Sequence, residues 1–132
     1  RPPDAPDAMP AQSEIVDAPG YVGLCASPRA DRAARDYAPF RDTLARVLAG
    51  VPEPVLVTIH SFTPVYHGVP REVEIGILHD RDTRLADAIL RKATAEARHR
   101  VVRNAPYGPQ DGVTHTLRAH ALPGGHLNVM IE

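Results

Sequence analysis

Two residues at the ends of apolar stretches have side chains that could do chemistry. His60 closes the run VLVTIH over residues 55–60, and Glu132 closes the alternating segment HLNVMIE over residues 126–132. An imidazole can bind a metal or move a proton, and a carboxylate at the end of an apolar strand is costly unless it is paired or hydrated. His60 could therefore be delivered to a site, or it could be a core histidine held by backbone partners. Glu132 could be placed for use.

Other polar residues give weaker signals. Arg118 and His120 lie on a polar segment just before the last apolar run, where they could bind an anionic substrate or simply face solvent. Ser61 lacks the sharp turn that exposes a catalytic serine, and it points to the opposite strand face from His60. The seven histidines contain no pair at the spacing of a helical zinc protease motif. Residues 124–125 indicate a turn, because no helix start or lysine follows them.

The elements that must position these residues alternate along the chain. A helix should begin at Ser27 and Pro28, be interrupted at Pro39 and stop at Gly50. Asp82 should cap a second helix with a stripe of apolar residues. The remaining predicted elements are strands over 54–60 and 73–77 joined by a long loop, a short strand near 101–102, a helical turn over about 111–120 and a strand from 127.

This order predicts an α/β fold, with helices on both faces of a sheet. Ligands in such folds collect at the carboxyl ends of the strands, which is where His60 and Glu132 stand. The continuous apolar run over 54–60 predicts a strand that is buried on both faces. The length of 132 residues predicts a single domain over 1–132, and five prolines favour an extended loop region over 1–26.

Composition narrows the class of partner. Lys and Arg (15) nearly balance Asp and Glu (16), which argues against nucleic acid and acidic membranes as partners. No apolar stretch approaches the roughly 18 residues of a membrane span, so we expect a soluble, cytoplasmic protein. The lone Cys25 cannot form an internal disulfide. Because the chain opens at Arg1 without a methionine, we also expect it to be part of a longer polypeptide.

Several motifs, in this order, carry a family resemblance. They are RPPDAPDAM (1–9), IHSFTPVYHGVPR (59–71), LHDRDTRLADAIL (78–90), NAPYG (104–108) and THTLRAHALPGGHLNVMIE (114–132). Together they resemble the N-formylglutamate amidohydrolase family over nearly the whole chain. That family is similar to the zinc carboxypeptidase and aspartoacylase type of hydrolase, so the resemblance implies a three-layer α/β/α sandwich around a mixed sheet.

The resemblance also implies roles for residues. His60 matches a zinc-ligating histidine, and Glu132 matches a glutamate that serves as general base. Arg1 matches the arginine of an Asn-Arg pair that binds substrate, while Arg118 and His120 fall among the substrate-pocket residues. Arg71 could help to bind an acidic substrate, or it could form a loop salt bridge. One zinc ion (Zn) is implied, but the early motif that supplies its other ligands is absent, so the resemblance implies that the chain is the C-terminal part of a longer hydrolase domain. The segment PGYVGLCASP (19–28) also differs from the family pattern, at Tyr21 and Cys25.

These residues predict a zinc-dependent amidohydrolase, which would cleave the amide of N-formyl- or N-acyl-amino acids. The substrate would be a small, acidic N-acyl amino acid. Two alternatives remain open: a non-catalytic domain that keeps the fold and binds anions or other ligands, and a structural remnant that needs a partner chain.

Overall fold

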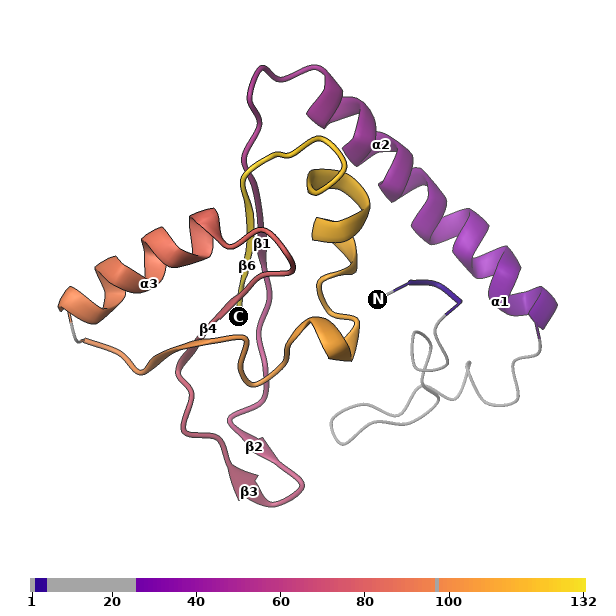
Figure 1. Ribbon diagram of the computed structural model, residues 1–132. Coiled ribbons are helices and arrows are strands. Elements are labelled where there is room, and N and C mark those ends of the chain that lie inside the picture. Colours follow the sequence, from indigo (N-terminus) through magenta and orange to yellow (C-terminus); the bar gives the residue numbers. More distant parts are fainter. Residues whose placement is uncertain (1, 5–25, 97) are drawn as a thin grey trace. The chain divides into compact units, whose positions relative to one another are not determined.

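The computed structural model describes residues 2–4, 26–96 and 98–132, and the chain divides into two compact units, Arg1–Pro52 and Glu53–Glu132 (Figure 1). Within the described ranges no helix is both long and apolar enough to cross a membrane. Most of the predicted loop over 1–26, together with Arg1 and Cys25, lies outside these ranges. The single domain over 1–132 stays a prediction.

The amino-terminal unit contains one helical stretch with an interruption. Helix α1 (Ala26–Arg32) runs into a π-helical turn, η2 (Ala33–Tyr37), and then into α2 (Ala38–Ala49). Pro39 stands in the first turn of α2, and the amide of Ala38 bonds to the carbonyl of Ala33. The predicted interruption at Pro39 is thus confirmed, because a proline can begin a helix but cannot donate within one. Gly50 is the C-cap, as predicted.

The carboxy-terminal unit is built around a four-stranded mixed sheet. The strands are β1 (Leu56–Ile59), β4 (Ile75–Leu78), β5 (Val101–Arg103) and β6 (Asn128–Ile131). Their order in the sheet is β1-β6-β4-β5. β1 runs parallel to β6, β4 runs antiparallel to β6, and β5 runs parallel to β4. The predicted α/β class with a mixed sheet is confirmed.

Helical segments lie on both sides of this sheet. On one face, α3 (Arg84–Glu96) packs its Ala86 against Ile77 and Val129. A π-helical turn, η4 (Leu117–Ala121), contacts β6 from the other side (Figure 1). Leu117 and Ala121 are fully buried. A short 3-10 turn, η3 (Pro109–Asp111), precedes η4. The three layers implied by the resemblance are present in this unit.

One prediction about β1 is wrong. The run over 54–60 was expected to be buried on both faces, but Val57 is 44% exposed and Ile59 is 70% exposed. The reason is the strand order, which puts β1 at the edge of the described sheet. α3 packs on β4, β5 and β6, so the face of β1 that carries Val57 and Ile59 lacks its cover.

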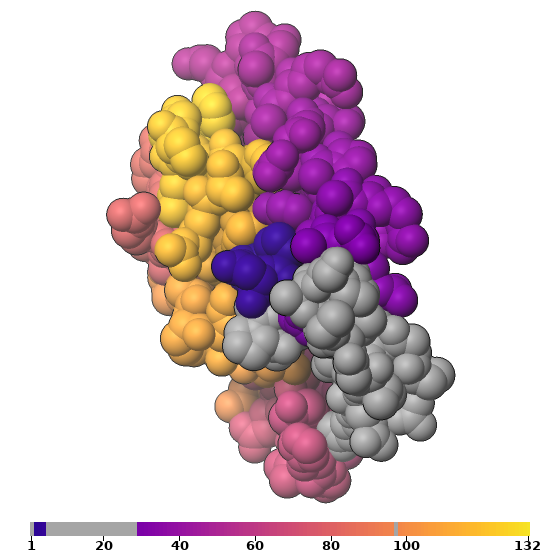
Figure 2. Space-filling view, turned by 90° about the vertical axis from the view of Figure 1, so that its right-hand side faces the viewer, coloured from indigo at the N-terminus to yellow at the C-terminus, as the bar shows by residue number. Residues whose placement is uncertain are grey.

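The loop between β1 and β4 contains a small hairpin. Strands β2 (Val65–Tyr66) and β3 (Val69–Pro70) pair antiparallel, and the two residues between them, His67 and Gly68, have φ of 49° and 76°. Two successive positive φ values are typical of the tight turn that suits the twist of a hairpin. Figure 1 shows this hairpin projecting beyond the end of the sheet, and its residues form the pink surface at the lower end of Figure 2.

Candidate functional site

Strand register brings His60 and Glu132 level with each other. Ile59 is opposite Ile131 in the parallel pair of β1 and β6, and the His60 amide donates to the Ile131 carbonyl at 2.8 Å. On the far side of β6, the backbones of Gly76 and Glu132 exchange two hydrogen bonds of 2.7 and 2.9 Å. Each candidate residue therefore directly follows one of two neighbouring parallel strands.

The two side chains share a pocket at this end of the sheet. Its volume is about 370 Å³, and it is lined by His60, Ser61, Phe62, Pro64, Arg71, Val73, Glu74 and Glu132. The His60 side chain has no hydrogen bond or ion pair with any residue that the structure describes, and the residue is exposed. An imidazole in this state is open to a ligand. His60 and Glu132 therefore line one pocket, whose surface is more apolar than polar.

Glu132 is only partly open to water. Its Oε2 atom is buried and has no hydrogen-bond partner in the described part of the chain. Burial raises the pKa of the Glu132 carboxyl above its ordinary value, and the positive charge of Arg71 opposes this rise. A carboxylate without donors in a partly dry pocket accepts a proton more readily than one in water.

Arg71 stands in the same pocket inside a frame of aromatic rings. Its Cζ lies 4.6 Å from the ring centre of Tyr66, 4.9 Å from that of Tyr107 and 5.4 Å from that of Phe62. Nη2 donates to the Tyr107 hydroxyl at 2.8 Å, and Nη1 donates to the Thr63 carbonyl at 3.4 Å. Among the described residues no carboxylate lies within 4.0 Å of the guanidinium, so the alternative of a loop salt bridge finds no partner there.

The loop that brings Tyr107 to Arg71 depends on a glycine in the sheet. A Cβ at Gly76 would lie 2.2 Å from the carbonyl oxygen of Ala105, far closer than any van der Waals contact. The absence of a side chain at Gly76 lets the loop pass close over β4. Tyr107 follows two residues later. Sequence reasoning missed this link, although the glycine inside a strand pattern was a possible signal.

Two of the predicted substrate-binding residues, Arg118 and His120, lie outside the lining of this pocket. Arg118 stands on η4, where its Nε lies 3.8 Å from Oδ2 of Asp80, and neither Arg118 nor His120 lines the pocket. Asp80 follows β4, which runs antiparallel to β6, so it stands toward the other end of the strands. Arg1 lies outside the described residues. Their proposed roles in substrate binding stay predictions.

The donor atoms in the pocket suit a metal only in part. Imidazole nitrogen is a common zinc ligand, and His60 offers one that is exposed. In residues 2–4, 26–96 and 98–132, however, no group of three or more His, Cys, Asp or Glu side chains is placed to hold an ion. The described residues therefore supply one candidate zinc ligand, His60, and not a complete zinc site.

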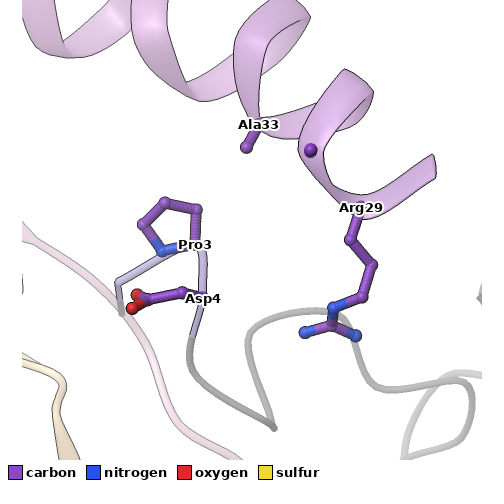
Figure 3. A pocket seen from close by; sticks show the side chains of 5 residues that line it. Pro3, Asp4, Arg29 and Ala33 are labelled. Atoms are coloured by element: carbon purple, nitrogen blue, oxygen red, sulfur yellow. The ribbon is translucent and has the colours of Figure 1, made fainter. Parts of the chain in front are cut away.

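A second hollow lies in the amino-terminal unit. It has a volume of about 310 Å³ and is lined by Pro3, Asp4, Arg29, Ala30 and Ala33 (Figure 3). In Figure 3 the carboxylate of Asp4 points away from the guanidinium of Arg29. Because its charged groups do not converge, this hollow is a weaker candidate for chemistry than the pocket of His60 and Glu132.

Comparisons with known proteins place this geometry in context. The sequence model of a family described as N-formylglutamate amidohydrolase matches residues 1–132. Among solved structures, gene product Atu2144 from Agrobacterium tumefaciens is 58% identical in sequence with a TM-score of 0.92. The match covers 100% of this chain and 54% of that one, so the chain spans about half the length of that protein. No match was found among curated proteins.

The fold and the pocket define an α/β protein with an imidazole and a carboxylate at the ends of adjacent parallel strands. The chain belongs to the N-formylglutamate amidohydrolase family. The resemblance noted from its motifs is thereby confirmed.

Proposed function

We propose that this chain supplies the general base and one metal ligand of a zinc-dependent amidohydrolase. The enzyme would cleave the amide of an N-formyl- or N-acyl-amino acid, of the N-formylglutamate type, to give a carboxylate and the free amino acid. The observation that carries the proposal is the pocket shared by His60 and Glu132 at the ends of β1 and β6. Membership of an amidohydrolase family supports the same reaction class.

His60 is the proposed zinc ligand from this chain. It directly follows a strand, its ring is open to the pocket, and its backbone is fixed by the bond to Ile131. The remaining ligands would come from residues outside the described ranges. When bound, zinc would polarise the amide carbonyl and lower the pKa of a water molecule toward neutrality.

Glu132 is the proposed base. It would take a proton from the attacking water as the bond from oxygen to the carbonyl carbon forms. It would then return this proton to the nitrogen of the leaving amine as the carbon–nitrogen bond breaks, so that one water is consumed for each amide. Burial raises the pKa of Glu132, which suits a carboxylate that must both accept and release a proton.

The test uses the natural full-length protein that contains this chain, assayed for bound zinc and for hydrolysis of a panel of N-formyl and N-acetyl amino acids. We expect about one zinc per chain and release of the free amino acid. His60→Ala should lose both. His126→Ala is the matched control, because His126 precedes β6 at the other end of the strand, and it should keep both.

Unchanged zinc content in His60→Ala would remove His60 as a ligand. If the unsubstituted protein bound zinc but hydrolysed none of the panel, the proposed reaction would be wrong. If it neither bound zinc nor hydrolysed any amide, yet still bound acidic amino acids, the non-catalytic binding domain would be the better account.

A further inference from the structure

We propose that Arg71 is the anchor for a carboxylate group of the substrate and thereby selects acidic N-acyl amino acids over their neutral amides. This inference rests on the proposed function, since it concerns the same pocket. It adds the residue that would distinguish a charged substrate carboxylate from a neutral amide.

The first support is position. The amide of Arg71 donates to the Pro64 carbonyl at 2.8 Å and so closes the base of the β2–β3 hairpin. This bond fixes the backbone at the mouth of the pocket, and the side chain lines the same cavity as His60 and Glu132. A ligand held by Arg71 would therefore lie beside both proposed catalytic groups.

The second support is the number of donors that Arg71 keeps unused. A guanidinium has five N–H donors, and the structure assigns one to Tyr107 and one to the Thr63 carbonyl, which leaves three. No other described residue accepts from them. The planar fork of a guanidinium matches the two oxygens of a carboxylate with two parallel hydrogen bonds.

The third support is the surroundings of the charge. Arg71 is half-buried, and the rings of Phe62, Tyr66 and Tyr107 lie around its guanidinium. Aromatic faces stabilise a cation and leave its edge available for an anion. Among the described residues no carboxylate lies within 4.0 Å of this partly desolvated cation, although its charge still acts on Glu132 in the same pocket. Such a cation favours an anionic ligand, because removing charge from water is costly until it is paired.

Tyr107 is the proposed positioning residue for this anchor. Its hydroxyl accepts from Nη2 of Arg71 at 2.8 Å, and its ring lies against the same guanidinium. Tyr107 is carried by the loop that passes close to Gly76. The direction of the fork is therefore set by the loop after β5 as well as by the hairpin.

The experiment compares three substrates in the full-length protein: N-formylglutamate and its two monoamides, each of which lacks one of the two carboxylates. For the unsubstituted protein we expect kcat/KM to fall by about 100-fold when the carboxylate that Arg71 binds is replaced by an amide. Arg71→Gln should lower kcat/KM for N-formylglutamate by a similar factor, mainly through KM. It should have little effect on the monoamide that already lacks that carboxylate.

Three further variants separate anchoring from folding. Arg71→Lys keeps the charge but loses the fork, so its loss should be smaller than that of Arg71→Gln. Tyr107→Phe should raise KM for N-formylglutamate several-fold and leave the monoamide unaffected. Arg91→Gln, on the exposed side of α3, is the matched control and should match the unsubstituted protein for all three substrates.

Equal losses for all three substrates in both Arg71→Gln and Arg71→Lys, or no loss in either, would overturn the inference. If the unsubstituted protein hydrolyses nothing, calorimetric titration with N-formylglutamate separates the two proposals. Binding that is lost in Arg71→Gln would keep the anchor while the hydrolase fails. Binding that is equal in both proteins, or absent from the unsubstituted one, would reject the anchor as well.

Discussion

A histidine stands at each end of the sheet, and the two differ in exposure and in hydrogen bonding. VTIH (57–60) and GILH (76–79) are similar segments, in which a histidine follows a short apolar strand. Because β4 runs antiparallel to β6, His79 stands at the opposite end of the sheet from His60. His60 is exposed in a pocket, whereas His79 is only 7% exposed.

Every polar position of the His79 ring is occupied. Its Nε2 accepts from Nη1 of Arg103 at 2.8 Å, because a guanidinium can only donate, and its Nδ1 donates to the Asp80 carbonyl at 2.6 Å. Arg103 also pairs with Asp87, and this hydrogen bond lowers the pKa of the Asp87 carboxyl. The cluster joins β4, β5 and α3, and this role is structural.

The carboxylates show the same contrast. Oδ2 of Asp80 accepts from the Thr114 hydroxyl at 2.9 Å, while Oε2 of Glu132 is buried without a donor in the described part of the chain. Hydrogen bonds within a protein usually satisfy buried polar atoms, and exceptions gather where function requires them. Among these histidines and carboxylates, the groups at the His79 end are satisfied, and those at the end proposed for chemistry have no partner among the described residues. The contrast does not extend to every polar group, because Oδ1 of Asn128, at the start of β6 near the His79 end, is also buried without a partner among them.

Replacing the base should give the largest effect. Glu132→Gln keeps the shape of the side chain but cannot accept a proton, so kcat should fall by about 1,000-fold. Bound zinc should be unchanged. Steady-state kinetics and metal analysis of the full-length protein check this result, and a loss below about 10-fold would show that another group acts as the base.

Replacing the structural histidine should have the opposite outcome. His79→Ala leaves the Asp80 carbonyl and the Arg103 guanidinium without their partner and opens a cavity, which should lower the free energy of unfolding by roughly 2 to 4 kcal/mol. Activity per folded molecule should persist. Denaturant unfolding measures the free energy of unfolding, and titration of active sites gives the activity per folded molecule. An unchanged free energy of unfolding would contradict the structural role of His79.

A milder substitution tests the same contrast between the two ends of the sheet at Asp80. Thr114→Val removes the hydroxyl that donates to Oδ2 of Asp80 and keeps the volume of the side chain. Thr114 is fully buried, so the free energy of unfolding should fall by about 1 to 2 kcal/mol. Arg118 remains near the same oxygen. Kinetic constants should stay within about two-fold of those of the unsubstituted protein. The reason is that Thr114 lies at the opposite end of the sheet from the pocket, where a change in stability need not alter catalysis.

The smallest expected effect is on pH dependence. Glu132 must be ionised to act, so kcat should fall as pH drops through its pKa, which burial places above the ordinary 4.5. A raised carboxyl pKa also means that ionised Glu132 weakens folding above this pKa, and that the penalty disappears below the ordinary value. Glu132→Gln should therefore be slightly more stable than the unsubstituted protein at neutral pH, but not at pH 4. An acid limb at or below 4.5 would contradict this prediction.

Sequence patterns predicted what depends on neighbours along the chain. The helix interruption at Pro39 follows from its missing amide, and the strands that end at His60 and Glu132 follow from apolar runs. Their meeting also depends on the two strands being parallel neighbours, which the structure shows and the sequence patterns did not predict. The family motifs added His60 and Glu132 as a pair.

Long-range pairing was beyond those patterns. Nothing in the run over 54–60 distinguishes an edge strand from a central one, so the exposure of Val57 and Ile59 was not predictable. The frame around Arg71 joins residues from positions 62 to 107, and the bonds of His79 reach Arg103. Such contacts depend on strand order, which composition and periodicity do not encode.

Because the Ala105 carbonyl passes close over Gly76, a residue within the sheet can influence which substrate the pocket prefers. A side chain at Gly76 would overlap the Ala105 carbonyl, so either the loop that carries Tyr107 or the Gly76 backbone would have to move. The second movement would reach Glu132, because the backbones of Gly76 and Glu132 are joined by two hydrogen bonds. A laboratory search for variants with altered substrate preference should therefore include this glycine, although Gly76 itself does not line the pocket.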